Sequence, residues 1–265
     1  MPRLRPDLSL LLMAALASHS LAAPLAHWSE PSTGILFTAV PKGCFEMGID
    51  AAVPPKNLSI IGRLGYNLAI GEDAIPRHNV CLESFWIATY EVSVEQWQTL
   101  MPLPPGNSSP EQPVRGVSWV MAEEFTKHLN KRHQGPYHFR LPTEAEWEYA
   151  CLGGSQHPAE GVPLHQVARY EQDGPQTSGM LQPNGYGLHD MLGNVWEWTA
   201  SPYRPYREVG HISYAPTAPD EPHSLRGGSY RTNYDQMGCQ RRSYAPSREE
   251  LPTFGLRLVR TEKES

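Results

Sequence analysis

The sequence lacks the features that mark several common functional classes. Its four cysteines stand singly, without the CxxC spacing of zinc sites and redox-active dithiols. Positive charge is also scarce, since 22 lysines and arginines face 28 aspartates and glutamates and give a net charge of −6. An acidic chain without a basic stripe is a poor binder of nucleic acid, so we expect no nucleic-acid partner. No internal repeat is present.

Long hydrophobic runs are absent beyond the N-terminus. There, Arg3 and Arg5 precede the apolar run LSLLLMAALA, and small residues follow in HSLAAP. This order is typical of a secretory signal peptide that is cleaved after the small residues. A membrane anchor is the alternative, but it needs about 20 apolar residues, and polar residues interrupt this run earlier. We therefore predict a signal peptide over 1–23, a mature domain over 24–265 without a membrane span, and a periplasmic or secreted location.

The predicted export places the four cysteines in an oxidising compartment, where disulfides form and persist. Exported proteins usually hold such cysteines in disulfides, so we expect two bonds rather than four thiols. The cysteines are Cys44, Cys81, Cys151 and Cys239. Four cysteines allow three pairings, and their spacing alone leaves all three open.

Proline and glycine, in contrast, are plentiful. The chain has 26 prolines and 22 glycines alongside 40% hydrophobic residues. This composition predicts many short elements with irregular connections, and so a loop-rich α+β fold rather than a helix bundle or a doubly wound sheet. Segments 33–50 and 78–90 are rich in β-branched and aromatic residues and are predicted to form strands. Regular signals fade between 151 and 224, and 255–259 is a predicted final strand.

Three helices have recognisable starts. SVEQ from Ser93 and TEAE from Thr143 are capping boxes, in which a hydroxyl caps the first turn and a Glu or Gln three residues on reaches back. Ser118 is expected to cap the third helix. Glu144 and Glu148 lie one turn apart on the helix that follows Thr143. We interpret them as part of a solvated face, with an acid–base pair as the alternative.

Longer motifs carry a resemblance to a known family. RLPTEAEWEYAC, NGYGLHDMLGNVWEW, LRGGSY and FGLRLV occur in this order and resemble signatures of the formylglycine-generating enzyme family, also called sulfatase-modifying factors. PKGCFEMG, RHNVCLESFWIATYEVS and PVRGVSW fit the N-terminal half of the same family, so the resemblance covers about 35–260. It implies a single compact domain with a C-type-lectin-like core and little regular structure.

The sequence departs from this family at its catalytic cysteines. Sulfatase activators of the family oxidise a substrate cysteine to formylglycine with a cysteine pair that binds copper(I), a metal suited to soft thiolates. In the register of the GGSY motif, the two positions hold Thr232 and Met237. In a register anchored downstream, the second position is Tyr234. Neither register supplies a thiol, so we expect no copper.

The resemblance also implies how the cysteines pair. In the downstream register, Cys239 falls on a structural half-cystine whose partner ends the EAEWEYxC helix, and that partner is Cys151 here. Cys44 and Cys81 remain, and we predict that they pair because the family places their two strands in one sheet region.

A calcium site is a further implication of the resemblance. In the segment that matches GLHDMLGNVWEW, the family holds calcium with two acid or amide side chains and two backbone carbonyls, which are hard oxygen ligands. The matching residues are Asp190, Gly193, Val195 and Glu197. The alternative is a tight turn packed by Trp196 and Trp198, with Glu197 bonded to backbone amides. We predict one structural calcium ion.

The substrate groove of the family lies over the GGSY segment. The residues expected to bind substrate by position are Trp196, Ser229, Tyr230 and Thr232. The candidates for a catalytic role are Ser229, Arg231, Tyr234 and Asp235. For Arg226 and Arg241 we expect a structural role, in which they hold loops through bonds to acidic side chains.

Three functions remain open at this point. Copper-dependent sulfatase activation is the least favoured, because the cysteine pair is missing. The resemblance extends to family branches that work without the thiol pair, and it makes the main expectation an exported maturation oxidoreductase that acts on a peptide-derived substrate, such as a siderophore chromophore precursor. The alternative is a non-catalytic periplasmic binding or regulatory module whose partner is a peptide-derived small molecule or an exported protein. The sequence does not decide between the last two.

Overall fold

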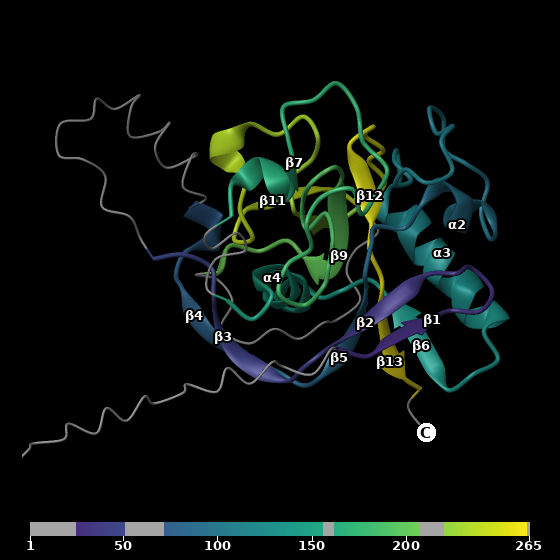
Figure 1. Cartoon of the computed structure of the whole chain (residues 1–265), viewed down its shortest axis with the longest axis horizontal. Helices are drawn as coiled ribbons and strands as arrows, with labels where there is room; N and C mark the ends of the chain where they lie inside the picture. The colour runs from purple at the N-terminus through teal and green to yellow at the C-terminus, as the bar shows by residue number, and fades with distance from the viewer. Residues whose placement is uncertain (1–24, 51–71, 156–161, 207–219, 264–265) are drawn as a thin grey trace, which may run out of the picture.

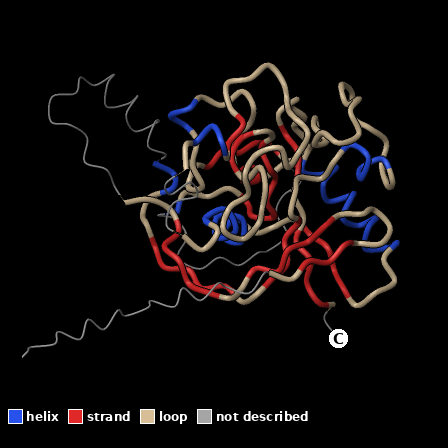
Figure 2. The backbone as a smooth tube through the Cα atoms, viewed as in Figure 1, coloured by secondary structure: helices blue, strands red, loops and turns tan. Residues whose placement is uncertain are grey.

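The computed structural model describes residues 25–50, 72–155, 162–206 and 220–263. The predicted signal peptide lies outside these residues, as does most of the connection between the two predicted strand segments. Among the described residues, two larger sheets and three α-helices account for most of the regular structure (Figures 1 and 2). No helix in this part of the chain is both long enough and apolar enough to cross a membrane.

The first sheet joins N-terminal strands to the last strand of the chain. Its strands, in spatial order, are β1 (His27–Ser29), β2 (Leu36–Val40), β5 (Phe85–Ala88), β13 (Val259–Glu262) and β6 (Tyr137–Arg140). All neighbours are antiparallel. Phe37, Ile87 and Val259 are fully buried, as expected of bulky side chains on the inner face of a half-buried sheet.

The second sheet flanks the GGSY segment, over which the substrate groove is expected. Its strands, in spatial order, are β11 (Arg242–Pro246), β10 (Pro222–Arg226), β9 (Trp196–Pro202) and β12 (Phe254–Leu256). β12 is parallel to β9, and the other neighbours are antiparallel. Arg226 at the end of β10 lies opposite Arg242 at the start of β11. The intervening segment, which contains the GGSY motif, therefore leaves the sheet and returns to it at adjacent points.

Two short pairings complete the strands. β3 (Gly43–Met47) and β4 (His78–Leu82) form an antiparallel ribbon, and β7 (Ala168–Arg169) runs parallel to β8 (Leu192–Gly193). In the β3–β4 ribbon, Cys44 lies directly opposite Cys81. Figure 1 shows this ribbon at the left, on the side of the molecule away from α2 and α3.

The three α-helices begin where the sequence predicts. They are α2 (Val94–Gln98), α3 (Trp119–Arg132) and α4 (Glu144–Leu152). Ser93 and Thr143 complete capping boxes, and the Ser118 side chain caps α3. α4 ends at Gly153, whose φ of 62° lies in the left-handed region that glycine adopts without a steric penalty. The 3₁₀ helices are η1 (Glu72–Ala74), η2 (Leu164–Gln166) and η4 (Tyr234–Gln236).

Two apolar clusters hold these elements together. One includes residues of α2, α3 and both larger sheets, and in it Trp97 stacks on Phe125 with ring centroids 4.9 Å apart. The other surrounds α4 and contains Trp147, Cys151 and Cys239. All five side chains are fully buried. Complete burial of a large apolar side chain contributes about 1.5–3 kcal/mol to folding. The second cluster therefore stabilises the packing of α4, whose Trp147 lies against Gly227 of the GGSY segment.

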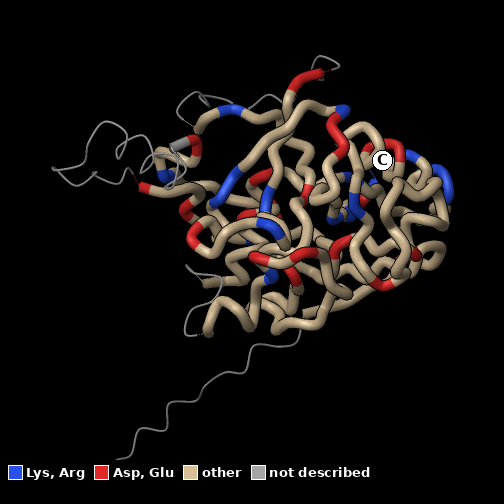
Figure 3. The backbone as a smooth tube through the Cα atoms, turned by 90° about the horizontal axis from the view of Figure 1, so that it is seen from above, with Lys and Arg blue, Asp and Glu red and all other residues tan. Residues whose placement is uncertain are grey.

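The structure confirms the loop-rich α+β fold, with two differences in detail. The segment after Cys151 contains the seven-residue strand β9, which the sequence did not signal because its burial pattern does not alternate cleanly. The predicted strand over 255–259 is divided between β12 and β13, since the chain passes there from the second sheet to the first. Acidic and basic residues are interspersed along the described chain (Figure 3).

Candidate functional site

A buried arginine fixes both ends of the GGSY segment. The Arg226 side chain donates from Nε to Glu144 Oε1 at 2.9 Å and from Nη2 to Glu148 Oε2 at 2.6 Å. Its Nη1 donates to the backbone carbonyl of Cys239 at 2.6 Å. Arg226 stands before the two glycines and Cys239 closes the segment, so one side chain links the start, the end and α4. The structural role predicted for Arg226 is confirmed.

The two glutamates of α4 correct the interpretation of a solvated helix face. Glu144 is 5% exposed and Glu148 is fully buried, because this face of α4 packs against the second sheet. Arg242 also donates to both carboxylate oxygens of Glu144, at 2.6 and 2.8 Å. Burial alone would raise the pKa of Glu144, but Arg226 and Arg242 hold it below its ordinary value. These carboxylates are structural ion-pair partners.

Two glycines make the sharp turn that follows Arg226. Gly227 and Gly228 have φ values of 92° and 80°, a region that other residues rarely adopt. A Cβ on Gly228 would approach Met237 Cε to 2.7 Å, and one on Gly227 would approach Trp147 Cζ2 to 3.1 Å. The backbone therefore passes close to its neighbours at this turn, which directs Ser229 inward.

The structure brings Ser229 and Thr232 together but buries both. Ser229 is 2% exposed and Thr232 is 8% exposed. The Ser229 backbone N–H donates to Thr232 Oγ1 at 2.9 Å, and the two hydroxyl oxygens are 3.4 Å apart. The Arg231 backbone N–H donates to Ser229 Oγ at 3.2 Å. Within the described residues, neither hydroxyl is hydrogen-bonded to a histidine or a carboxylate. In this arrangement the hydroxyls stabilise the turn.

Of the other two predicted substrate-binding residues, Tyr230 is buried and Trp196 is half-buried. Tyr230 is 1% exposed, and its backbone N–H donates to the Asn194 carbonyl at 2.8 Å. Its carbonyl accepts from the Gln172 N–H at 2.6 Å. Trp196, on β9, is half-buried and packs against the first apolar cluster. Of the four predicted substrate-binding residues, Trp196 is therefore the most exposed.

The other catalytic candidates share an exposed surface beside the turn, which we call the tyrosine surface. It consists of the half-buried Tyr170 and the exposed Arg231, Tyr234 and Asp235. Tyr234 is 58% exposed, and its ring centroid lies 5.7 Å from that of Tyr170. The Tyr234 backbone N–H donates to Glu171 Oε1 at 2.9 Å, and the Arg231 guanidinium lies over the Tyr230 ring at 5.5 Å. Arg241 holds this segment by donating to the Asp235 carbonyl at 3.1 Å rather than to an acidic side chain.

All four cysteines are held in disulfides. Cys151 bonds to Cys239, and Cys44 bonds to Cys81. Both predicted pairings are thus present, and Cys239, which follows the GGSY motif, is structural. By the resemblance, the family's cysteine pair would fall on Thr232 and on Met237 or Tyr234, according to the register. Met237 packs against Gly228.

The predicted calcium ligands lie in one turn, but the two carboxylates have different partners. Glu197 is 1% exposed and accepts from Arg257 Nη2 at 2.9 Å and from Trp147 Nε1 at 2.7 Å. Asp190 is 5% exposed and accepts from the Gly179 N–H at 2.6 Å. Burial raises the pKa of Asp190. The alternative with Glu197 bonded to backbone amides does not match either, since its partners are side chains.

A third buried carboxylate beside this turn was not predicted. Glu91 is 1% exposed and accepts from the Val195 N–H at 3.1 Å, Asn194 Nδ2 at 2.6 Å and Ser178 Oγ at 2.9 Å. Burial, with Asp190 and Glu197 nearby, raises the pKa of Glu91 well above its ordinary value. Glu91 lies three residues after the end of β5, between Tyr90 and Val92, and the local sequence gives no signal of such distant partners.

These contacts fit the predicted calcium ligands only in part. Glu197 forms an ion pair with the Arg257 guanidinium, so it is not a free carboxylate ligand. Within the described residues, no group of three or more His, Cys, Asp or Glu side chains has the arrangement of a metal site. The calcium ion stays a prediction, and Asp190 is the side chain on which it depends.

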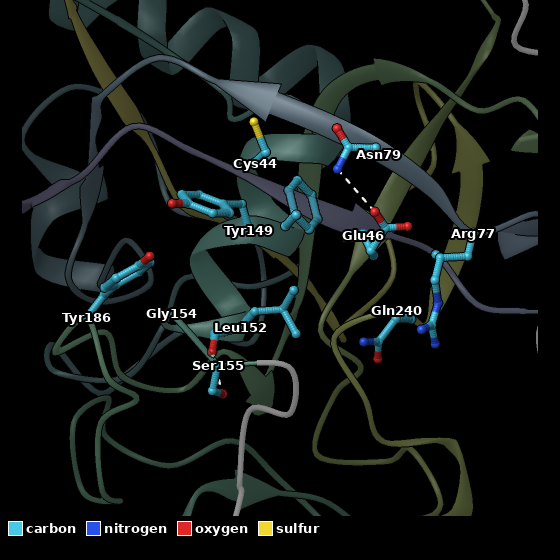
Figure 4. Close-up of a pocket in the computed structure, with 12 residues that line it drawn as sticks. Cys44, Glu46, Arg77, Asn79, Tyr149, Leu152, Gly154, Ser155, Tyr186 and Gln240 are labelled. Atoms are coloured by element: carbon cyan, nitrogen blue, oxygen red, sulfur yellow. Dashed lines mark hydrogen bonds between the residues drawn. The ribbon is translucent and has the colours of Figure 1, made fainter.

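A cavity of about 530 Å³ lies beside the Cys44–Cys81 disulfide, with Cys44 in its wall. It is lined by the β3–β4 ribbon, the end of α4, Tyr186 and Gln240 (Figure 4). None of the predicted substrate-binding or catalytic residues lines it. No motif in the sequence pointed to this cavity, because its walls come from five separate parts of the chain.

Comparison with known proteins agrees with this architecture. The family model of the sulfatase-modifying factor enzyme 1-like domain matches residues 31–262. The chain belongs to this family. The formylglycine-generating enzyme of Bos taurus is 32% identical over 145 residues, which are 46% of this chain and 36% of that protein. The enzyme of Mycobacterium tuberculosis is 35% identical over 118 residues, which are 34% of this chain and 40% of that protein.

The chain is also similar to part of a protein kinase. The serine/threonine-protein kinase pkn1 of Chlamydia pneumoniae is 27% identical over 225 residues, which are 71% of this chain and 35% of the kinase. The chain thus covers well under half of the length of these curated relatives.

Solved structures confirm the fold. PvdO from Pseudomonas aeruginosa superposes with a TM-score of 0.73 at 21% identity, covering 91% of this chain and 99% of PvdO. Treponema denticola variable protein 1 superposes with a TM-score of 0.66 at 20% identity, covering 88% of this chain and 98% of that protein. At this identity the likeness concerns the fold alone.

Proposed function

We propose that this member of the sulfatase-modifying factor family is an exported maturation factor that acts on a peptide-derived substrate without copper–thiolate chemistry. The observation that carries the proposal is the state of the GGSY segment. Its one cysteine, Cys239, is bonded to Cys151. The positions that match the family's cysteine pair hold Thr232 and, according to the register, Met237 or Tyr234, so neither register supplies a thiol. A neutral thioether cannot replace two thiolates as ligands that activate copper(I).

The tyrosine surface is the place where such a substrate would be processed. Arg231 offers a cation for an acidic group of the substrate. Tyr234 offers a phenol for hydrogen bonding, and Asp235 offers a carboxylate that can accept a proton. All three side chains are exposed, whereas Ser229 and Thr232 already bond to each other. We accordingly assign contact with the substrate to Arg231, Tyr234 and Asp235.

A non-catalytic binding module is the second candidate. The burial of Ser229 and Thr232 favours this candidate. Their hydroxyls are hydrogen-bonded within the turn and so are not available for chemistry on a substrate. The same tyrosine surface would then hold a peptide-derived molecule or an exported protein without changing it. Export itself is proposed from the N-terminal sequence, and cell fractionation of the tagged full-length chain would test it.

Deletion and complementation separate the two candidates. A maturation factor predicts that the deletion strain accumulates an exported peptide-derived compound that differs from the wild-type product by a fixed mass, such as two hydrogens or one oxygen. Complementation with the chain carrying Tyr234→Phe and Asp235→Asn should leave the precursor in place. The exposed Arg248→Ala variant is the matched control and should restore the product. Unchanged masses with altered amounts would support the binding module instead.

A direct assay addresses sulfatase activation. Purified, disulfide-intact protein is incubated with copper and a peptide that carries a sulfatase motif, and the aldehyde product is followed by mass. We expect no aldehyde above the level of copper alone. Aldehyde formed over repeated turnovers would overturn the proposal.

A further inference from the structure

The cavity beside the β3–β4 ribbon has walls of two kinds (Figure 4). Tyr149 and Tyr186 lie on one side, and Arg77 and Gln240 lie on the other, with Leu152 between them. The ribbon contributes Glu46 and Asn79, whose side chains are hydrogen-bonded at 3.1 Å. Its volume of about 530 Å³ falls within the usual range for small-molecule sites, roughly 300–1,000 Å³.

The aromatic wall is fixed by packing. The ring centroids of Phe45 and Tyr149 are 5.3 Å apart, and those of Tyr149 and Tyr186 are 5.9 Å apart. Burial, together with a hydrogen bond to Tyr149, raises the pKa of Tyr186, so the Tyr186 phenol is neutral near pH 7. Tyr149 is 8% exposed and belongs to the second apolar cluster. A ligand would therefore meet a preformed aromatic wall, with little loss of side-chain entropy on binding.

The polar wall carries charges of both signs. Arg77 pairs with Asp50 through Nε at 3.5 Å, and the two side chains are 43% and 75% exposed. An ion pair with this exposure contributes little to stability, so a ligand carboxylate can compete for the guanidinium. Glu46 is an exposed carboxylate that accepts one bond from Asn79, which leaves acceptor sites for a cation. The Gln240 and Asn79 amides supply both donors and acceptors.

We propose that this cavity binds a zwitterionic aromatic molecule of about the size of a dipeptide. Its carboxylate pairs with Arg77, its ammonium group pairs with Glu46, and its ring packs against Tyr149 and Tyr186. A purely anionic ligand would face Glu46, and a purely apolar one would leave the charged wall without partners. The proposal is independent of the tyrosine surface, since none of that surface's four residues lines the cavity.

Titration calorimetry with glycyl-L-tyrosine tests the proposal on the mature, disulfide-intact chain. We expect saturable binding that weakens about tenfold in Arg77→Met, the effect of losing one charge-assisted bond. Glu46→Gln should weaken it to a similar extent. N-acetyl-glycyl-L-tyrosine amide, which lacks both terminal charges, should bind more weakly than the free dipeptide to the wild type and equally to the two variants.

Two controls make the result specific to the cavity. Arg231→Ala, on the tyrosine surface, should leave the affinity unchanged, and circular dichroism should show that each variant is folded. Absence of saturable binding up to about 10 mM, where the binding free energy is below about 3 kcal/mol, would overturn the proposal. Binding that is insensitive to Arg77→Met and Glu46→Gln but is lost in Arg231→Ala would also overturn it, and would move the ligand to the tyrosine surface.

Discussion

Arg226 and Glu144 form an ion pair in which the Arg226 side chain is 0% exposed and the Glu144 side chain 7%. The pair joins the end of β10 to the first turn of α4, across 82 residues of sequence. Desolvation of two charges is costly, and excellent geometry with further hydrogen bonds is needed to offset it. Here Arg226 has Glu148 and the Cys239 carbonyl as further partners, and Glu144 has Arg242. The GGSY segment thus rests on a fully partnered buried network.

Removal of Arg226 should strongly destabilise the protein. Arg226→Met keeps much of the volume but leaves Glu144 and Glu148 with fewer partners in a buried place, which costs about 3–5 kcal/mol. Urea denaturation at pH 7 measures this as a lower midpoint. Arg231→Met, five residues along and exposed, should stay within about 0.5 kcal/mol of the wild type. Equal effects of the two substitutions would contradict the assigned role of the network.

The same network predicts a loss of stability in acid. The folded-state pKa of Glu144 is lower than its ordinary value of 4.5, because Arg226 and Arg242 outweigh the opposing effect of burial. The unfolded state therefore binds more protons, so the stabilisation is present above pH 4.5 and is lost as the pH falls through the lower folded value. A single carboxylate contributes a slope of at most about 1.4 kcal/mol per pH unit.

Urea midpoints between pH 7 and pH 3 would reveal this contribution. Glu144→Gln should be less stable at pH 7 and should lose less stability in acid than the wild type. Glu124→Gln is the control, because a hydrogen bond from Lys127 also lowers the pKa of Glu124, but the pair is exposed. It should follow the wild-type profile. A Glu144→Gln profile parallel to that of the wild type would show that another group governs the acid transition.

The sequence predicted what is local and missed what depends on distant contacts. The capping boxes at Ser93 and Thr143 require residues three apart, and both are present. The local sequence around Glu144 and Glu148 predicts a solvated face, because the partners that bury them lie about 80 residues away. The burial of Glu91 could not be predicted for the same reason, since its partners are more than 80 residues along the chain.

The candidate site shows the same division. The sequence shows that position 232 and both candidates for the second position, 237 and 234, lack a thiol. The pairing of Cys151 with Cys239 followed from the resemblance to the family. The burial of Ser229 and Thr232 could not, because it results from a turn in which each uses the other as a partner. The cavity could not be foreseen either, since Glu46, Tyr149, Tyr186 and Gln240 meet only in the folded chain.

The two disulfides should differ in their resistance to reduction. Cys44 and Cys81 are exposed, whereas Cys151 and Cys239 are 0% exposed. Thiol–disulfide exchange needs direct access of a thiolate to a sulfur, so a buried bond reacts only after local opening. We expect dithiothreitol without denaturant to reduce Cys44–Cys81 at least about tenfold faster, the ratio that corresponds to about 1.4 kcal/mol of opening free energy.

Timed alkylation and peptide mapping would give the order of reduction. In a Cys44→Ser and Cys81→Ser double variant, the remaining bond should persist under the same conditions. Loss of the Cys151–Cys239 bond, which joins residues 88 apart, should lower the free energy of unfolding by about 4 kcal/mol in the chain-entropy model. Faster reduction of Cys151–Cys239 would contradict the burial assigned to the second apolar cluster.

Calcium is the last prediction, and Asp190 is the residue that tests it. If calcium binds the turn, a concentration of 100 times the dissociation constant stabilises by about 2.7 kcal/mol, which raises the melting temperature by roughly 5–10 °C in a domain of this size. Asp190→Asn keeps an acceptor for the Gly179 N–H but removes the negative charge, so it should lose most of the calcium-dependent rise. Glu197→Ala should lower the melting temperature with calcium or with chelator, because it leaves Arg257 without its carboxylate. Wild-type protein that melts at the same temperature in calcium and in chelator, and carries no metal by elemental analysis, would show that Arg257 alone neutralises Glu197 and that the turn needs no ion.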